Sequence, residues 1–142
     1  MGKIAFVFPG QGAQVVGMGQ NVYENSAVAK DVFEQASKAV DLDLKALCFE
    51  ENNDINITEF TQVCLLTTSV AIMEELKTRG VKADVAAGLS LGEYCALVAA
   101  GSMNFVDAAK AVRKRGIFMQ EEVPAGKGTM AAILGMDAAE ID

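Results

Sequence analysis

The sequence contains no histidine and no tryptophan, and it has only two prolines and three cysteines among its 142 residues. Without histidine, the chain cannot by itself complete a serine–histidine or cysteine–histidine catalytic pair, and it lacks a common nitrogen ligand for zinc. Cys48, Cys64 and Cys95 are scattered and form no C-x-x-C pair. We therefore expect no metal site and no cofactor, and we expect the three cysteines to be reduced residues in or near the core.

Basic residues are also scarce, with 12 Lys and Arg against 19 Asp and Glu and a formal net charge of -7. A general nucleic-acid-binding protein needs clustered cations to neutralise phosphates, so this class is excluded. The apolar stretch that precedes Pro9 is too short for the core of a secretory signal peptide. We expect a cytoplasmic protein that binds neither nucleic acid nor membrane.

Apolar residues make up 51% of the chain, and their spacing predicts alternating strands and helices. Residues 3–8 form a continuous apolar run, which is typical of a parallel strand buried on both faces, and residues 81–88 resemble a second strand. The remaining spacing predicts helices over residues 26–40, 58–79, 90–100 and 104–123, and a glycine-flanked strand over 126–136. This order predicts one α/β domain whose parallel sheet has helices on both faces.

The end of the chain carries the start signal of a further helix. Asp137 and Glu140 have the spacing of a capping box, and the sequence stops about one turn later. We therefore expect a fragment cut just inside an element. Such a fragment should expose apolar surface, and it should either self-associate or bind a complementary C-terminal segment.

A serine stands between two glycines in the stretch GLSLG, at residues 88–92. A strand is expected before it and a helix after it, as in a nucleophile elbow, a sharp turn that lifts the serine side chain above the sheet. Gly88 and Gly92 would let the strand and the helix approach without Cβ clashes. Ser90 would serve equally well as the N-cap of the helix, and this stretch alone leaves both interpretations open.

A second glycine-rich stretch, FPGQG at residues 8–12, favours the nucleophile. The spacing of Gly10, Gly12 and Gly17 does not fit a dinucleotide fingerprint. Gly12 and Gly17 have the spacing of a phosphate-binding P-loop, but Met18 and Gly19 stand where that loop needs Lys and Ser or Thr. Acyl transfer needs two backbone N–H donors facing the oxyanion, one from the residue after the nucleophile, here Leu91, and one from a separate strand-end loop. FPGQG is a suitable loop of that kind.

Three adjacent cations occur in the stretch RKRG, at residues 113–116. Arg113 and Lys114 are expected on a solvated face of the helix near its C-terminal end. Arg115 shares a helix face with apolar residues that include Val112 and Met119, so it should require a carboxylate partner from the protein or from a ligand.

Four stretches together resemble the N-terminal half of the malonyl-CoA:acyl carrier protein transacylase family: FVFPGQGAQ, TQ…LLTTSVA, AGLSLGEYCALVAAG and RKRGIFMQEEVPAGKGTMAAILG. The resemblance implies an α/β-hydrolase-like core, here residues 1–124, with a ferredoxin-like subdomain inserted in it. Residues 125–142 would be the linker and first strand of that truncated subdomain. The implied reaction, in fatty acid biosynthesis, moves a malonyl group from malonyl-CoA to the phosphopantetheine thiol of acyl carrier protein through an acyl-serine. Malonyl-CoA is a substrate, and no cofactor is implied.

The resemblance also implies residue roles. Ser90 would carry the malonyl ester, the backbone amides of Gln11 and Leu91 would form the oxyanion hole, and Arg115 would bind the free malonyl carboxylate. The chain departs from the family at Leu89, where histidine is usual, and after Gln62, where proline is usual. The family's general base is a histidine in its C-terminal half, so this chain alone is expected to be inactive.

Two other functions share some of these features. A serine esterase would use the same elbow, would pass its acyl group to water and would not need Arg115. An inactive binding or scaffold fragment would keep the elbow as a vestige.

Overall fold

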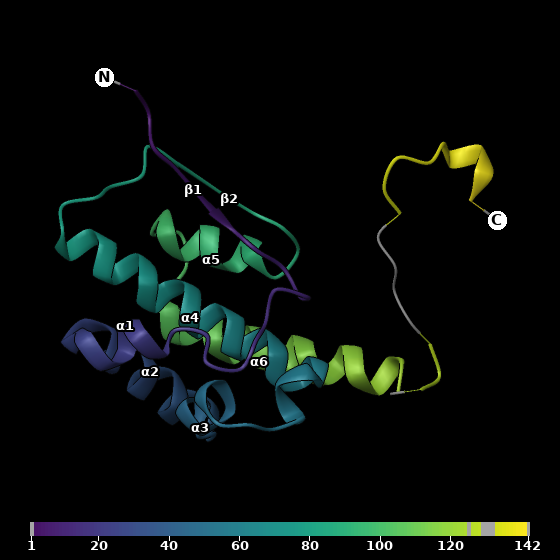
Figure 1. Cartoon of the computed structure of the whole chain (residues 1–142), viewed down its shortest axis with the longest axis horizontal. Helices are drawn as coiled ribbons and strands as arrows, with labels where there is room; N and C mark the ends of the chain where they lie inside the picture. The colour runs from purple at the N-terminus through teal and green to yellow at the C-terminus, as the bar shows by residue number, and fades with distance from the viewer. Residues whose placement is uncertain (1, 125, 129–132, 142) are drawn as a thin grey trace.

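The computed structural model describes residues 2–124, 126–128 and 133–141, and it is an α/β structure with a small parallel sheet (Figure 1). Strands β1 (Ala5–Phe8) and β2 (Val85–Gly88) pair in parallel, with Ala5 opposite Val85 and Phe8 opposite Gly88. The helical elements are α1 Gln20–Asn25, α2 Ala27–Val40, α3 Leu44–Phe49, η1 Asp54–Asn56, α4 Thr58–Thr78, α5 Gly92–Ala99, α6 Phe105–Glu122 and η2 Ala138–Glu140. None of the helices in this described part is both long and apolar enough to cross a bilayer.

The four helices predicted from apolar spacing are confirmed as α2, α4, α5 and α6, and several of their ends carry the predicted signals. The Ser26 side chain accepts a hydrogen bond from the Ala29 N–H at the start of α2. Asn104 accepts bonds from two N–H groups in the first turn of α6. Gly80 follows α4 with a φ of 80°, in the left-handed region that glycine adopts without strain.

Helices α1 and α3, which have six residues each, were not predicted from the sequence. Helices this short show too little periodicity to be predicted and have little stability of their own. An aromatic cluster holds them against α2: the Tyr23 ring of α1 and the Phe49 ring of α3 lie 5.5 and 5.2 Å from the Phe33 ring. Both short helices therefore depend on tertiary packing.

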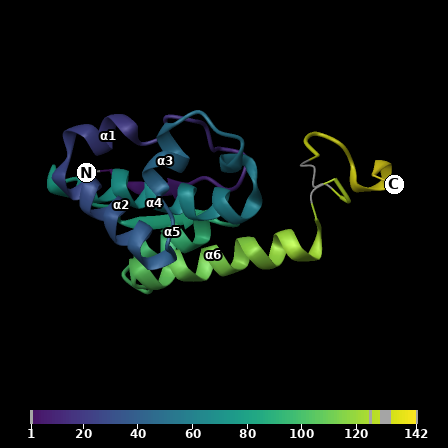
Figure 2. The ribbon, with the colours of Figure 1, turned by 90° about the horizontal axis from the view of Figure 1, so that it is seen from below.

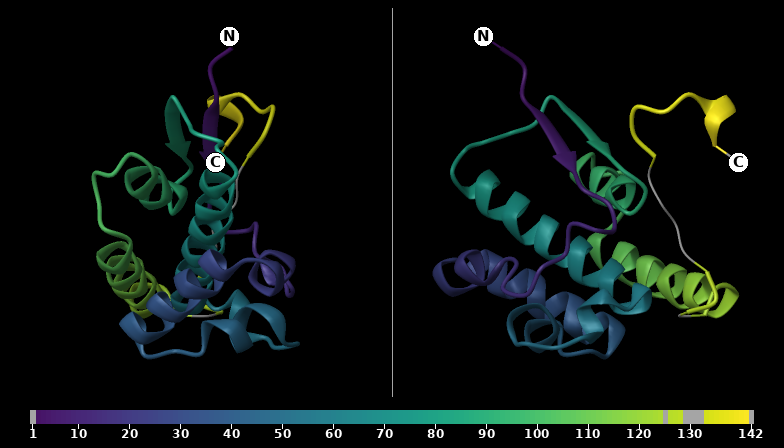
Figure 3. Two further views of the ribbon diagram at one scale, coloured as in Figure 1. Left: turned by 90° about the vertical axis from the view of Figure 1, so that its left-hand side faces the viewer. Right: turned by 45° about the vertical axis from the view of Figure 1, so that its right-hand side comes forward.

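Helix α4 is the central element of the fold. Figures 1 and 3 show α1, α2 and α3 on one side of it and the sheet with α5 on the other, and Figure 2 shows the long helix α6 along the edge of the same helical layer. Its buried residues occupy all sides, so it is the core around which the other elements pack. They are Thr61, Gln62, Val63, Cys64, Leu65, Leu66, Thr67, Thr68, Val70, Ala71 and Met73.

Helices α4 and α6 touch backbone to backbone at Gly116. A Cβ atom at this position would lie 2.8 Å from Glu59 Cα and 2.9 Å from the Thr58 carbonyl oxygen. Only glycine fits there without moving one helix. The side chains on either side of this point therefore face each other at close range.

The sheet is covered on one face only within the described part of the chain. Phe6 and Phe8 point toward the helices. On the opposite face of the sheet, Val7 is 75% exposed, and Val85 and Ala87 of the neighbouring strand are also exposed. The prediction of strands buried on both faces, with helices on both faces of the sheet, is wrong for these residues. An apolar run indicates that a strand can be buried on both faces. It does not indicate that the elements that cover both faces are among these residues.

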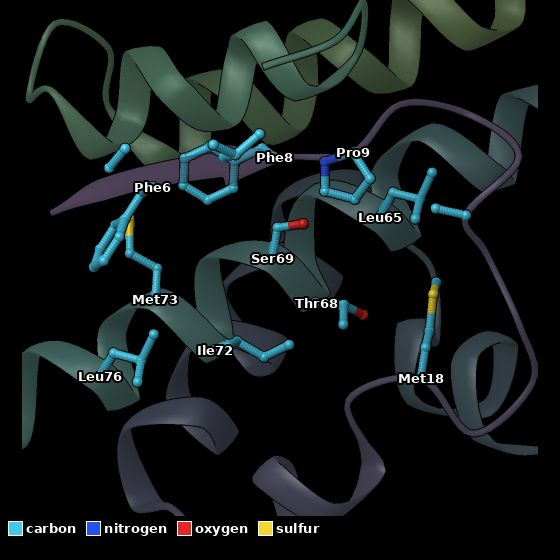
Figure 4. Close-up of a pocket in the computed structure, with 13 residues that line it drawn as sticks. Phe6, Phe8, Pro9, Met18, Leu65, Thr68, Ser69, Ile72, Met73 and Leu76 are labelled. Atoms are coloured by element: carbon cyan, nitrogen blue, oxygen red, sulfur yellow. The ribbon is translucent and has the colours of Figure 1, made fainter. Parts of the chain in front are cut away.

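An apolar cavity of about 330 Å³ lies between β1 and α4 (Figure 4). Phe6, Phe8, Ile72 and other apolar side chains form most of its wall. The Thr68 hydroxyl at this wall is buried and has no hydrogen-bond partner among the described residues.

The predicted strand over residues 126–136 falls partly outside the described residues, because positions 129–132 are among those not described. Residues 126–128 and 133–136 on either side have no strand structure. The expected helix start at Asp137 is found as the single 3-10 turn η2. The Asp137 N–H donates to Glu140 Oε2 at 3.3 Å, which is one of the two bonds of a capping box.

We predict that the 142-residue chain self-associates through the exposed sheet face. The double variant Val7→Thr/Val85→Thr should lower the association, because it reduces the apolar surface that association removes from water. Light scattering over a range of concentrations measures this, with Val28→Thr/Ile57→Thr, which alters exposed apolar residues outside the sheet, as the matched control. A chain that stays monomeric at every concentration would contradict the prediction.

We also predict that Gly116→Ala destabilises the chain by about 1–3 kcal/mol, because the new methyl group overlaps α4. In an exposed helix the same change would stabilise by roughly 0.5–1 kcal/mol, so the sign of the effect is diagnostic. Urea unfolding measures it. Lys114→Ala, at an exposed position two residues away, should stay within about 0.5 kcal/mol of the unmodified chain.

Candidate active site

The backbone makes a strained turn at Ser90, between the end of β2 and the start of α5. Ser90 has a φ of 51°, in the left-handed region that non-glycine residues rarely adopt. Such strain costs about 1–3 kcal/mol and is concentrated at functional sites. The side chain is exposed, as the nucleophile-elbow interpretation requires.

The two glycines of GLSLG are required by close backbone packing, as predicted. A Cβ atom at Gly88 would overlap the carbonyl group of Gly92, and a Cβ atom at Gly92 would lie 2.8 Å from the Pro9 carbonyl oxygen. The end of β2, the start of α5 and the loop after β1 therefore meet with no room for side chains. This contact fixes where Ser90 lies.

The loop FPGQG lies beside the elbow. A Cβ atom at Gly10 would be 2.8 Å from the Leu89 carbonyl oxygen. The side chain of the next residue, Gln11, donates from Nε2 to Thr58 Oγ1 at 3.1 Å, which ties the loop to α4. The backbone N–H groups of Gln11 and Leu91 donate to no group in the described part of the chain. Both groups remain available to an oxyanion.

Arg115 on α6 contacts Ser90 across the fold. Its Nη2 atom donates to Ser90 Oγ at 3.0 Å, although the two residues are 25 positions apart in the sequence. Its guanidinium carbon also lies 5.9 Å from the centre of the Tyr94 ring. Among the described residues no carboxylate lies within 4.0 Å of this half-buried cation. The serine hydroxyl thus lies beside an arginine that no described acidic residue neutralises.

Gln62 is a site residue for which the sequence assigned no role. Its side chain is fully buried on α4, where Oε1 accepts from Arg115 Nη1 at 2.6 Å and Nε2 lies 3.1 Å from Met119 Sδ. The sequence signals were its place in the stretch TQ…LLTTSVA, which carries the resemblance, and a polar amide followed by the apolar residues VCLL. Such a residue needs a hydrogen-bond partner when buried, but the sequence cannot say which.

Arg113 does not lie on a solvated face, so that prediction is wrong. Its Nη1 atom donates to Glu59 Oε2 at 2.7 Å and to the Glu59 carbonyl oxygen at 2.9 Å. Its guanidinium carbon lies 4.9 Å from the Phe60 ring centre. The close approach of α4 at Gly116 brings these partners within reach. Lys114, between the two arginines, is exposed as expected.

A larger hollow of about 740 Å³ adjoins this group of residues. Gln11 and Thr58 line one side of it, and Phe118 and Met119 of α6 line another. Gln11 belongs to the loop beside the elbow, and Met119 contacts Gln62, the partner of Arg115. These residues place the hollow beside the site, although Ser90 and Arg115 do not line it, and it has room for a substrate of moderate size.

The cysteines take no part in this arrangement. All three are buried, as predicted. Burial raises the pKa of the Cys95 thiol to about 11, and a hydrogen bond to Cys48, together with burial, raises the pKa of Cys64 well above its usual value. Cys64 and Cys95 therefore stay protonated near neutral pH and are poor nucleophiles. Among the described residues, no group of acidic, histidine or cysteine side chains could hold a metal ion.

Comparison with known proteins identifies the same parts of the chain. The model of the acyl transferase domain family matches residues 5–141. The malonyl CoA-acyl carrier protein transacylase of Bacillus subtilis (strain 168) is 53% identical over 139 residues, which are 97% of this chain and 44% of that protein.

Solved structures agree with this match. The malonyl CoA-acyl carrier protein transacylase of Coxiella burnetii superimposes with a TM-score of 0.90 at 46% identity, over 97% of this chain and 44% of that one. A malonyl-transacylase in complex with a type II PKS acyl-carrier protein superimposes with a TM-score of 0.83 at 41% identity, over 88% of this chain and 41% of that one.

The chain thus spans less than half the length of the relatives that it matches. The family match nevertheless covers all of the elements β1 to α6, including the elbow, the loop beside it and Arg115. The chain belongs to the acyl transferase domain family.

Proposed function

We propose that this chain is part of a malonyl-CoA:acyl carrier protein transacylase, which moves a malonyl group to the phosphopantetheine thiol of acyl carrier protein in fatty acid biosynthesis. The observation that carries the proposal is the 3.0 Å contact between Arg115 Nη2 and Ser90 Oγ. It joins a nucleophile on a strained turn to a cation suited to a carboxylate. The names of the relatives support the same reaction.

In the first half-reaction, Ser90 Oγ attacks the thioester carbonyl of malonyl-CoA. The new C–O bond forms, the C–S bond breaks, and the coenzyme A thiol leaves with the proton that the serine gives up. The oxyanion formed on the way would accept hydrogen bonds from the backbone N–H groups of Leu91 and Gln11. In the second half-reaction, the phosphopantetheine thiol attacks the ester carbonyl. A new C–S bond forms, the bond between the acyl carbon and Ser90 Oγ breaks, and the proton lost by the thiol returns to the serine.

The proton transfers need a base. Ser90 Oγ accepts a hydrogen bond from Arg115, so the serine's own hydroxyl proton is free to point at a base. The 142 residues contain no histidine. We propose that the base is a histidine outside these residues, in the part of the relatives' length that this chain does not span.

Arg115 would select the acyl group. A guanidinium can bind a carboxylate with two parallel hydrogen bonds. In a malonyl ester on Ser90, two carbon atoms stand between the ester oxygen and the distal carboxylate. No described acidic residue competes for this cation. An esterase that passes its acyl group to water would have no use for such an arginine, and a scaffold would have no use for the strained turn.

The finer architecture is part of the same proposal. Residues 1–124 would be the N-terminal part of an α/β-hydrolase-like core, and residues 125–142 the start of an inserted ferredoxin-like subdomain. Three buried cysteines without disulfides fit a reducing compartment, so we also propose a cytoplasmic location.

We predict that the family-length protein, meaning this chain continued to the length of its relatives, gains one malonyl group on Ser90 when it is given malonyl-CoA. Intact-mass and peptide mass spectrometry measure the adduct. Ser90→Ala should abolish it, and Ser102→Ala, at an exposed serine outside the site, should not. The 142-residue chain alone should react far more slowly because it lacks the base. A fast stoichiometric adduct on that short chain would contradict this account of activation.

We predict that Arg115→Ala in the family-length protein lowers kcat/KM for malonyl-CoA by at least about 10²-fold and leaves acetyl transfer unchanged or faster. Malonyl transfer falls because its carboxylate loses its partner. Acetyl transfer does not fall, because an acetyl group has no carboxylate to pair with Arg115. Parallel kinetics with both thioesters measure the ratio, with Lys114→Ala as the charge-matched control. Equal losses for both acyl groups would make Arg115 a structural cation only.

A further inference from the structure

Gln62 and Ser90 each accept a hydrogen bond from the guanidinium of Arg115. One terminal nitrogen, Nη1, donates to Gln62 Oε1 at 2.6 Å, and the other, Nη2, donates to Ser90 Oγ at 3.0 Å. Arg115 is thus fixed at both terminal nitrogens, once by a fully buried amide and once by the nucleophile. Acylation would turn the Ser90 hydroxyl into an ester, whose oxygen is a poorer hydrogen-bond acceptor, whereas the Gln62 amide would be unchanged.

The carboxamide of Gln62 has one possible orientation. Its Nε2 atom lies 3.1 Å from the sulfur of Met119, which is one turn beyond Arg115 on α6. If the amide were rotated by 180°, its N–H₂ group would face the guanidinium and two donors would meet. The two α6 residues therefore hold the Gln62 oxygen toward Arg115.

The arginine two positions earlier has a different kind of partner. Arg113 pairs with the carboxylate of Glu59 at 2.7 Å, whereas Arg115 is bound by the neutral amide of Gln62. Glu59 and Gln62 are three positions apart on α4, so both pairs bridge the same two helices. A carboxylate neutralises its arginine, but an amide orients the arginine and leaves its charge available.

We propose that Gln62 is a positioning residue that makes Arg115 a binding site for the acyl group's carboxylate, an inference that rests on the proposed function. Its neutral oxygen fixes the guanidinium without consuming the charge. The remaining N–H groups of Arg115 then face the substrate. Met119 keeps the amide oriented.

The test uses the family-length protein and two substitutions at one position. Gln62→Leu removes the acceptor, and we expect KM for malonyl-CoA to rise by at least about tenfold with a smaller change in kcat. Gln62→Glu supplies a carboxylate that neutralises Arg115 as Glu59 neutralises Arg113. We expect it to lower the malonyl-to-acetyl ratio of kcat/KM at least as far as Gln62→Leu does.

A double-substitution cycle separates positioning from a purely structural role. In an Arg115→Ala background, Gln62→Leu should change malonyl transfer by less than about threefold, because its partner is already gone. Thr67→Val is the matched control, since it removes another buried polar group of α4, whose hydroxyl donates to the Val63 carbonyl oxygen at 2.8 Å and to no other group in the described part of the chain. This control should lower thermal stability without changing the malonyl-to-acetyl ratio.

The possible failures are distinguishable. If Arg115→Ala alters the malonyl-to-acetyl ratio and Gln62→Leu does not, the positioning role is overturned and the proposed function stands. If the effects of Gln62→Leu and Arg115→Ala are additive, Gln62 acts on the fold alone and the inference is again overturned. If Arg115→Ala itself leaves the ratio unchanged, selection by Arg115 is wrong and the role of Gln62 is lost with it.

Discussion

The close contact of α4 and α6 at Gly116 is the constraint on which the candidate site depends. Because no side chain separates the helices there, residues on either side of the contact meet at hydrogen-bond distance. Glu59 reaches Arg113 on one side, and Gln62 reaches Arg115 on the other. The same helix contact therefore places the guanidinium of Arg115 beside Ser90.

Arg113 and Arg115 of α6 have partners of different chemistry, and the partner determines whether the charge of each arginine is already paired. Arg113 meets a carboxylate and an aromatic ring, which satisfy its charge and join the helices. Arg115 meets an amide oxygen and a hydroxyl and lies 5.9 Å from the Tyr94 ring centre, but no carboxylate among the described residues pairs with it. A half-buried cation of this second kind keeps its charge available, which is the basis for proposing that it binds an acidic ligand.

The elbow adds the second half of the chemistry by a similar use of backbone contact. Gly88 and Gly92 let β2, α5 and the loop after β1 meet without side chains, and the turn between them forces Ser90 into a left-handed conformation. The strain exposes the hydroxyl at the start of a helix, where free N–H groups favour negative charge. Backbone geometry rather than side-chain packing thus sets the position of the Ser90 hydroxyl.

The sequence by itself determined the features that depend on neighbouring residues. Apolar periodicity located the helices α2, α4, α5 and α6 and both strands, and capping residues marked several helix ends. The glycines around Ser90 identified a sharp turn between strand and helix. These features are local, because hydrogen bonds within one turn and steric limits on φ and ψ act over a few positions.

Only the tertiary structure decided which distant residues meet. Gln62 and Arg113 gained their partners through the crossing of two helices, and the short helices α1 and α3 exist because an aromatic cluster holds them. The exposed outer face of the sheet likewise depends on which elements cover it, which an apolar run cannot reveal. Contacts between residues far apart in the chain arise from packing, and no local pattern encodes the partner.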